Sequence, residues 1–318
     1  MLLIRTTALW VAIFVSLGLS GARVANAQDE GEDSATVASQ NPSPMVDHTR
    51  KHGRITQTDF NGISYELNTI LPKPVDIFVP LRFEKLRKID LLIHFLGSSN
   101  VVKYAAQEFP RSIVVVTVNL GMGSKVYGDV FKDSTAFPVL LKSVIKSVEQ
   151  KLKHPIVIRG IVLSGFSAGY GAVRQIIAVK SNLAKVDAVL LLDGIHASYI
   201  PDRKVLSKGG KIDSTQLEPF LELAREASKP NSHMKFLITH SEIFPGTFAS
   251  TTETTDYILE RLGIKIEPVL KWGPLGMQEL SIARKNRFEV LGFAGNTAPD
   301  HIDHLEALFY FLKKVVRL

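Results

Sequence analysis

The chain has 318 residues, 45% of them hydrophobic and 22% charged, a balance that is ordinary for a globular protein and excludes disorder over most of its length. The formal net charge of +7 falls to +5 when Arg5 and Arg23 of the N-terminal segment are set aside, and this surplus is scattered along the chain, so we expect no nucleic acid partner. Cysteine is absent, which excludes disulfides and thiolate metal sites.

The first 27 residues have the three parts of a secretory signal peptide. A positively charged start is followed by an apolar run over 8–19 and by the cleavage pattern Ala25-Asn-Ala27. The apolar run is short for a membrane span, so we expect cleavage after Ala27, no stable membrane insertion, and a secreted or periplasmic protein. An uncleaved N-terminal anchor is the alternative. Residues 28–53 are acidic and then rich in Ser, Thr and Pro, which predicts a disordered linker.

Residues 54–318 form the predicted catalytic domain, in which strand-like apolar runs alternate with amphipathic, helix-like segments. Two strands at 60–67 and 75–79 predict an antiparallel N-terminal edge. The later strands are expected at 89–96, 113–118, 161–163, 186–192, 236–239 and 288–293. The helices are expected at 101–109, 136–153, 172–177, 216–227, 255–262 and 299–316. This alternation predicts an α/β fold with one doubly wound, mainly parallel sheet and helices on both of its faces.

The stretch Gly165-Phe-Ser-Ala-Gly169 follows one of these strands and precedes a helix, and it has the G-x-S-x-G pattern of a nucleophile elbow. A serine at the tip of so sharp a turn sits in a strained backbone conformation, and side chains two residues before or after it would collide. Glycine at both flanks satisfies this requirement. The alternative interpretation is a glycine-rich strand-to-helix turn with an incidental serine.

With the strand end His94-Phe-Leu-Gly97 and a histidine pair after the last strand, this elbow resembles the α/β-hydrolase superfamily, specifically its serine esterase-like members, over residues 55–318. The superfamily also uses the chain order nucleophile, acid, histidine. The resemblance implies a serine hydrolase that cleaves a carboxylic ester or related acyl bond of a small-molecule or polymer substrate. The reaction would pass through an acyl-enzyme and need no cofactor and no metal.

Ser167 is the predicted nucleophile, and a serine hydroxyl needs a base within hydrogen-bonding reach. His301 and His304 are the candidates, and we favour His301 because it lies in the turn or first helical residue after the last strand. The pair could instead bind a metal together with Asp300 and Asp303, because residues three apart share a helical face.

The acid that orients the histidine is predicted to be Asp193 or Glu242. Each stands directly after an apolar strand, at the sheet edge where α/β proteins place functional groups. We favour Asp193, because aspartate is commoner in this role and Gly194 permits a tight turn, although Glu242 occupies the strand end that the superfamily uses more often.

The resemblance places one oxyanion-hole N–H on Ala168 and the other on Ser98 or its immediate neighbour. The sequence departs here from the superfamily's common His-Gly pair, because Gly97 stands three residues after His94. We interpret His94 as a buried structural histidine. The segment 195–212 is long enough to form a cap over the site.

Two other histidines, His196 and His240, lie near strand ends, where each could line the pocket or serve only as a polar loop residue. Tyr127 and Tyr170 are further candidates for substrate contact. Two other functions use the same cleft: a non-catalytic hydrolase-fold protein that binds a ligand or partner, and an acyltransferase with a non-water acceptor.

Overall fold

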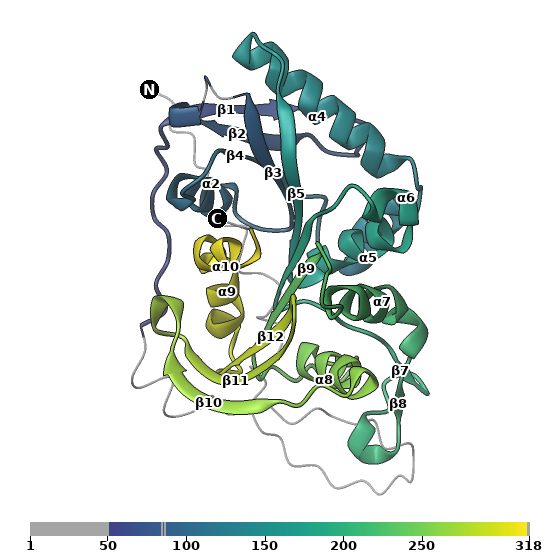
Figure 1. The fold of residues 1–318 in the computed structure, drawn as a ribbon. Helices are drawn as coiled ribbons and strands as arrows, with labels where there is room; N and C mark the ends of the chain where they lie inside the picture. Colours follow the sequence, from purple (N-terminus) through teal and green to yellow (C-terminus); the bar gives the residue numbers. More distant parts are fainter. Residues whose placement is uncertain (1–50, 84, 86, 317–318) are drawn as a thin grey trace, which may run out of the picture. The chain divides into compact units, whose positions relative to one another are not determined.

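The computed structural model describes residues 51–83, 85 and 87–316, so the predicted signal peptide and nearly all of the predicted linker lie outside the described residues. Within these residues the main feature is a ten-stranded sheet in the order β1-β2-β4-β3-β5-β6-β9-β12-β11-β10 (Figure 1). Its strands are β1 (Gly62–Leu67), β2 (Val75–Pro80), β3 (Lys88–Phe95), β4 (Ile113–Val118), β5 (Val157–Phe166), β6 (Ala188–Leu192), β9 (Lys235–His240), β10 (Glu267–Trp272), β11 (Gln278–Lys285) and β12 (Phe288–Phe293).

The middle of the sheet, from β4 through β3, β5, β6 and β9 to β12, is parallel. At one edge β1 and β2 are antiparallel, as predicted. At the other edge β11 and β10 are also antiparallel, which we did not predict. Their segment has no buried apolar run to mark it, because most side chains of β10 are exposed. The predicted fold class, a doubly wound, mainly parallel sheet with an antiparallel N-terminal edge, is confirmed.

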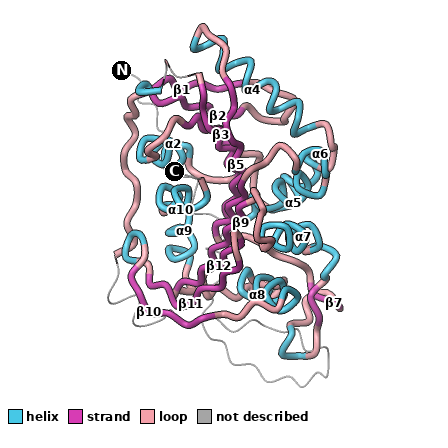
Figure 2. The backbone as a smooth tube through the Cα atoms, viewed as in Figure 1, coloured by secondary structure: helices cyan, strands magenta, loops and turns pink. Residues whose placement is uncertain are grey.

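Helices cover both faces of this sheet (Figures 1 and 2). They are α2 (Ser99–Glu108), α3 (Ser124–Phe131), α4 (Ala136–Leu152), α5 (Tyr170–Ala178), α6 (Lys180–Leu183), α7 (Glu218–Ala227), α8 (Thr251–Leu262), α9 (Ala298–Glu306) and α10 (Leu308–Val315). Side chains alternate across a strand, so each central strand contributes to two cores. In β4, for example, Val114 and Val116 pack on the side of α4, α5 and α7, whereas Val115 packs on the side of α2 and α10.

The order of the strands shows at which point of the sheet a ligand-binding crevice is expected. From β3 the chain crosses to β4 on one side, and then returns past β3 to form β5 on the other side, so the strand order reverses between β3 and β5. Loops at the carboxyl ends of two such strands diverge and leave a crevice between them, which is where open α/β sheets bind ligands. The loops at this point carry Ser98 and Ser167, because Phe95 pairs with Gly165 at the ends of the two strands.

Several boundaries differ from the predicted ones for local reasons. Helix α8 begins at Thr251 rather than 255, because Ser250 and Glu253 form a capping box there. The predicted final helix at 299–316 is two helices, since the chain turns at Ala307 (φ −84°, ψ 9°). Within the predicted cap, the short strands β7 (Tyr199–Ile200) and β8 (Lys211–Ile212) pair as an antiparallel ladder. No helix in the described part of the chain is both long and apolar enough to cross a membrane.

Candidate active site

Ser167 lies at the turn between β5 and α5, with a positive φ of 48° and a half-buried side chain. A left-handed conformation is unusual for a residue other than glycine and costs energy, and such strain is concentrated at functional sites. The glycine flanks are explained by close approach. A Cβ on Gly169 would lie 2.1 Å from the carbonyl oxygen of Phe95, and one on Gly165 would lie 3.0 Å from the backbone of Gly169. The elbow is therefore wedged against the end of β3.

His301 lies in the first turn of α9, and its Nδ1 is 2.7 Å from Oδ2 of Asp193. A carboxylate only accepts hydrogen bonds, so Nδ1 is the donor and Nε2 is left with a lone pair in the neutral ring. The ring packs on Phe166, the residue before Ser167, with centroids 4.5 Å apart and planes tilted by 33°. The imidazole therefore lies beside the elbow with a nitrogen able to accept a proton.

Asp193 directly follows β6, has a positive φ of 44°, and is only 3% exposed. Besides the imidazole, it accepts a hydrogen bond from the backbone N–H of Ser241 (3.0 Å) and another from the Ser241 hydroxyl (2.6 Å). Burial by itself would raise the pKa of Asp193, but the neighbouring His304 and His301 rings and the Ser241 hydroxyl outweigh it, and they hold the pKa well below its ordinary value. Asp193 is thus an anion at neutral pH.

The turn that carries the acid also contacts the turn that carries the serine. A Cβ on Gly194 would lie 2.3 Å from the carbonyl oxygen of Ser167 and 2.9 Å from its nitrogen. Only glycine allows the two backbones to approach this closely. The turns that carry Ser167 and Asp193 are therefore packed as one unit at the ends of β5 and β6.

The other predicted histidine and acid lie elsewhere. His304 is 1% exposed, its Nδ1 is 2.7 Å from the hydroxyl of Thr239, and burial lowers its pKa to about 4. Glu242 is exposed and accepts a hydrogen bond from the backbone N–H of Gly295 (3.0 Å). Of the two candidates for each role, the structure brings His301 and Asp193 together.

The predicted oxyanion donors stand at the ends of neighbouring strands. Ser98 is the exposed N-cap of α2, after a left-handed residue at Leu96 (φ 64°). Gly97 is held in both directions by Asn119, which accepts from its N–H (3.0 Å) and donates to its carbonyl (2.9 Å). Since the N–H of Gly97 is already used, Ser98 is the better candidate, and the first N–H groups of a helix have no partner within it.

His94 has the structural role expected of it. It is fully buried, its Nε2 lies 3.1 Å from the carbonyl of Leu96 and its Nδ1 lies 3.0 Å from the hydroxyl of Ser164. The carbonyl requires a donor, so Nε2 carries the proton and Nδ1 accepts from the serine. Desolvation lowers the pKa of His94 to about 4, so the ring is neutral. It is thus bonded to the start of the loop that carries Ser98.

An aromatic group that includes His196 adjoins the site. His196 donates from Nδ1 to the carbonyl of Ala249 (3.0 Å), and burial lowers its pKa to about 4. Its ring meets Tyr170 and Phe248 edge to face, at centroid distances of 5.6 and 4.8 Å. Sequence reasoning missed Phe248 and Ser241, since neither belongs to a recognisable motif. Tyr127, by contrast, is buried and accepts a hydrogen bond in the core from the backbone of residue 120.

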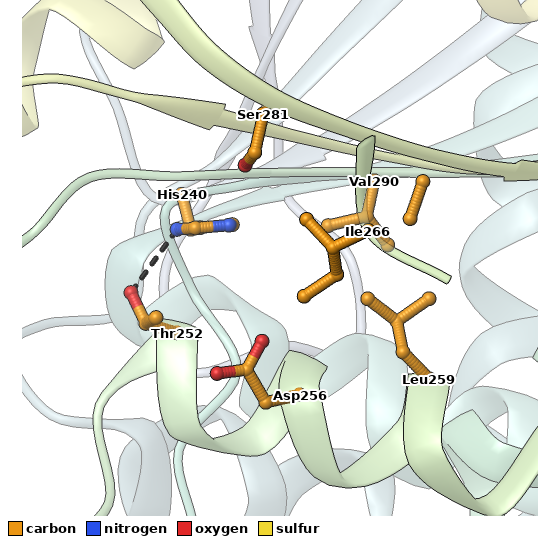
Figure 3. Close-up of a pocket in the computed structure, with 8 residues that line it drawn as sticks. His240, Thr252, Asp256, Leu259, Ile266, Ser281 and Val290 are labelled. Carbon is orange, nitrogen blue, oxygen red and sulfur yellow. Dashed lines mark hydrogen bonds between the residues drawn. The ribbon is translucent and has the colours of Figure 1, made fainter. Parts of the chain in front are cut away.

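His240 lines a different cavity, of about 180 Å³, between α8 and the strands β9, β11 and β12 (Figure 3). Its Nδ1 is 3.0 Å from the hydroxyl of Thr252, and Asp256 faces the same space. Ser167, His301 and Asp193 are not among the lining residues. His240 is therefore not placed among the groups that could carry acyl chemistry.

The donors of the alternative metal site do not converge. His301 is bonded to Asp193 and His304 to Thr239. Asp300 and Asp303 instead approach His52, with potential ligand atoms within 4.8 Å of one another. The guanidinium of Arg54 bonds to the Asp303 carboxylate in this cluster. A cation seated there would be repelled by the guanidinium, so the cluster fits an ion-pair network better than a metal.

No protein-family model matches this chain, and no curated protein matches it. Many solved structures do. A mutant of the feruloyl esterase module from Clostridium thermocellum, complexed with sinapinate, is 14% identical, with coverage of 87% of this chain and 95% of that chain and a TM-score of 0.47. An acetyl xylan esterase from Aspergillus awamori is 13% identical over 79% of this chain and 100% of that chain, with a TM-score of 0.46. The enterobactin esterase from Shigella flexneri is 13% identical over 79% and 60%, with a TM-score of 0.47.

The sheet topology carries the fold assignment without these likenesses. The elbow follows the central parallel strand β5, and the loop between β3 and α2 lies beside it. Helix α9, which carries His301, follows the last parallel strand, β12. The resemblance in fold to α/β-hydrolases, which the sequence predicted, is confirmed.

Proposed function

We propose that the protein is a serine hydrolase that cleaves a carboxylic ester or related acyl bond with Ser167, His301 and Asp193. The observation that carries the proposal is the 2.7 Å hydrogen bond between the last two, with the imidazole packed beside the strained elbow. An imidazole oriented by a buried carboxylate, next to an accessible serine, is the arrangement that nucleophilic acyl transfer requires.

In the proposed reaction, Oγ of Ser167 attacks the acyl carbon while Nε2 of His301 takes the hydroxyl proton. The backbone N–H groups of Ala168 and Ser98 stabilise the negative charge that develops on the carbonyl oxygen. The imidazolium gives its proton to the leaving oxygen as the carbon–oxygen bond breaks, and Asp193 remains ionised throughout. Water, deprotonated by the same Nε2, then attacks the acyl-enzyme, and the proton returns to Ser167 as the acid product leaves.

A fluorophosphonate probe and a short-chain p-nitrophenyl ester test this proposal. The wild-type protein should label on Ser167 and hydrolyse the ester. Ser167→Ala should abolish labelling, and both Ser167→Ala and His301→Gln should lower kcat by about 10⁴-fold or more, because the members of such a triad act as a unit. Labelling of another residue, or an unchanged rate in Ser167→Ala, would refute it.

The same experiment separates the alternatives. A non-catalytic binding protein of the same fold would not label, since only an activated serine reacts with the probe. An acyltransferase would label, but would release acylated acceptor in preference to free acid when a nucleophilic acceptor is added. Analysis of the products distinguishes it from a hydrolase.

We propose that this hydrolase is exported. The proposal rests on the charged start, the apolar run and the Ala25-Asn-Ala27 pattern of the sequence. N-terminal sequencing of the protein recovered outside the cytoplasm should read from Gln28. A chain found only in the cytoplasm, with Met1 intact, would contradict it.

A further inference from the structure

Residues 52–60, here called the N-terminal strap, run along the outside of α9 and α2 without regular secondary structure (Figure 2). The strap then leads into β1, at the far edge of the sheet from β12. It thus joins the beginning of the described chain to the helix that carries the candidate base.

The strap contacts α9 through charged groups. Asp303 is only 1% exposed, and its two carboxylate oxygens lie 2.5 Å from Nη1 of Arg54 and 2.8 Å from Nδ1 of His52. Arg54 also donates to the carbonyl of Pro299 (3.2 Å), at the start of the helix. One turn further on, Glu306 accepts the backbone N–H of residue 55 (2.9 Å). Two successive turns of α9 are therefore bonded to the strap.

Apolar contacts fix the strap in place. Ile55 and Phe60 pack against the core cluster formed by α2, α10 and the sheet. The ring of Phe60 meets that of Phe78 in β2, with centroids 6.0 Å apart. The amide of Gln57 donates to the side chain of Gln107 at the end of α2 (3.0 Å). A segment anchored at both ends in this way can resist movement of the helix beneath it.

The opposite side of α9 is held by the sheet. His304 is bonded to Thr239 in β9, and its ring meets Phe293 at the end of β12. His301, one turn before His304, bonds to Asp193. Helix α9 is therefore bonded to the strap through Asp303 and Glu306, and to the sheet through His304.

We propose that Arg54, with the N-terminal strap, is a positioning element for the catalytic base: by neutralising the buried Asp303 carboxylate it holds α9 where His301 reaches Asp193. This inference rests on the proposed function. A carboxylate that loses a cationic partner in a dry environment is relieved when its helix moves toward water. Displacement of a catalytic group by about 1 Å can cost about 10²-fold in rate, so a small movement of α9 has a large effect on turnover.

The chain offers a matched control. At the other end of the sheet Asp90 is 2% exposed and is bonded to two guanidinium groups, those of Arg111 and Arg159. Arg54 and Arg111 are similarly exposed, at 31% and 27%. Arg54→Met and Arg111→Met each remove one guanidinium from a buried aspartate. Only the first aspartate lies on the helix of the candidate base.

In the full-length protein, Arg54→Met should lower kcat for the p-nitrophenyl ester at least about tenfold, with KM changed less than about threefold, and should slow fluorophosphonate labelling in parallel. Arg111→Met should keep kcat within about twofold of the wild type, and Arg54→Lys, which retains the charge, should recover most of the lost rate. Equal kcat in the two methionine variants would overturn the inference. If Arg54→Met does not fold, His52→Gln should show a smaller loss in the same direction, and an unchanged kcat there would also overturn it.

A substrate-free measurement separates the failure of this inference from the failure of the proposed function. The Nδ1 proton of His301, bonded to Asp193, should give a far-downfield proton NMR signal that is absent in His301→Gln. Arg54→Met should shift or broaden this signal, whereas Arg111→Met should leave it unchanged. A wild-type protein that neither labels nor hydrolyses esters would refute the function alone. A signal that does not respond to Arg54→Met would refute the positioning role alone.

Discussion

Two buried aspartates, one near each end of the parallel strands, have opposite surroundings. Asp90, near the start of β3, is held by Nε and Nη2 of Arg159 (2.9 and 2.7 Å) and by Nη2 of Arg111 (3.0 Å). Asp193, just past the end of β6, is held by neutral donors of Ser241 and by the imidazole of His301. The exposed fractions of the two residues are nearly the same, at 2% and 3%.

The difference lies in whether the partner can change its charge. A guanidinium is always protonated, so the Asp90 cluster has one state and can only stabilise the fold. An imidazole nitrogen can take up a proton and release it again, which a guanidinium cannot do, so the Asp193 pair suits the proton transfer of the proposed reaction. Burial of an acid therefore does not identify a functional site, whereas the chemistry of its partner does.

Neutralising Asp193 and Asp90 in turn should give the largest difference between the two clusters. Asp193→Asn should lower kcat by about 10⁴-fold, because the amide N–H₂ donates to Nδ1 and forces the proton onto Nε2, which can then no longer accept one from Ser167. Asp90→Asn should leave kcat within about twofold and lower the free energy of unfolding by about 1–3 kcal/mol, because it removes only charge-assisted hydrogen bonds far from the site. Ester kinetics and urea unfolding measure the two effects. A similar loss of kcat in both variants would contradict the assignment.

The two ends of the sheet should also differ in how stability depends on pH, because the neutral buried histidines lie at the carboxyl ends of the strands. Burial lowers the pKa of His94, His196 and His304 to about 4 in the folded protein. In the unfolded chain their pKa is about 6.5, so the unfolded state binds protons first as the pH falls, and stability is lost between about pH 6.5 and pH 4. Each ring contributes up to about 1.4 kcal/mol per pH unit in that window.

Urea unfolding at pH 7, 6 and 5 measures this slope. His94→Gln should make the free energy of unfolding depend less steeply on pH, by the contribution of one ring. The arginines around Asp90 add nothing to this slope, because arginine does not titrate in this range. A free energy of unfolding that is constant from pH 7 to pH 5 would show that these rings bind as many protons in the folded state as in the unfolded chain, and would contradict the lowered pKa values.

The smallest effect is expected at Glu242, the acid that the sequence left as the alternative. Its carboxylate bonds only to the backbone of Gly295 among its described contacts, and it is exposed. Glu242→Gln should change kcat by less than about threefold and the free energy of unfolding by less than about 1 kcal/mol, as for most surface substitutions. A loss of kcat as large as that of Asp193→Asn would transfer the acid role to Glu242.

The fold and the centre of the site were predictable because their signals are local. The elbow places two glycines around one serine within five residues, and each glycine has a steric reason. Asp193 was suggested by its place after an apolar strand, and His301 by its place at the start of the last predicted helix. Strand ends and helix starts are visible in sequence, and parallel strands collect them at one edge of a sheet.

The strap and the second antiparallel edge were not predictable in the same way. The contact of Arg54 with Asp303 spans 249 residues, and no periodic pattern relates two such positions. The strap has no regular structure and is mainly polar, so its sequence resembles that of the linker before it. Ser241 was overlooked because its contribution is a backbone N–H and a hydroxyl, which become specific only when β6 and β9 are paired.

Gly194 packs closely on the backbone of Ser167. The candidate site therefore consists of two parts: the paired turns of Ser167 and Asp193, and the helix that carries His301. Ser167 and Asp193 follow adjacent strands and are brought together when β5 and β6 pair. The base arrives on a helix near the end of the chain that is bonded to residues near its beginning. We therefore expect a chain that ends between β12 and α9 to keep its serine and aspartate in register and yet be inert, and the separate C-terminal fragment to restore activity when it is added.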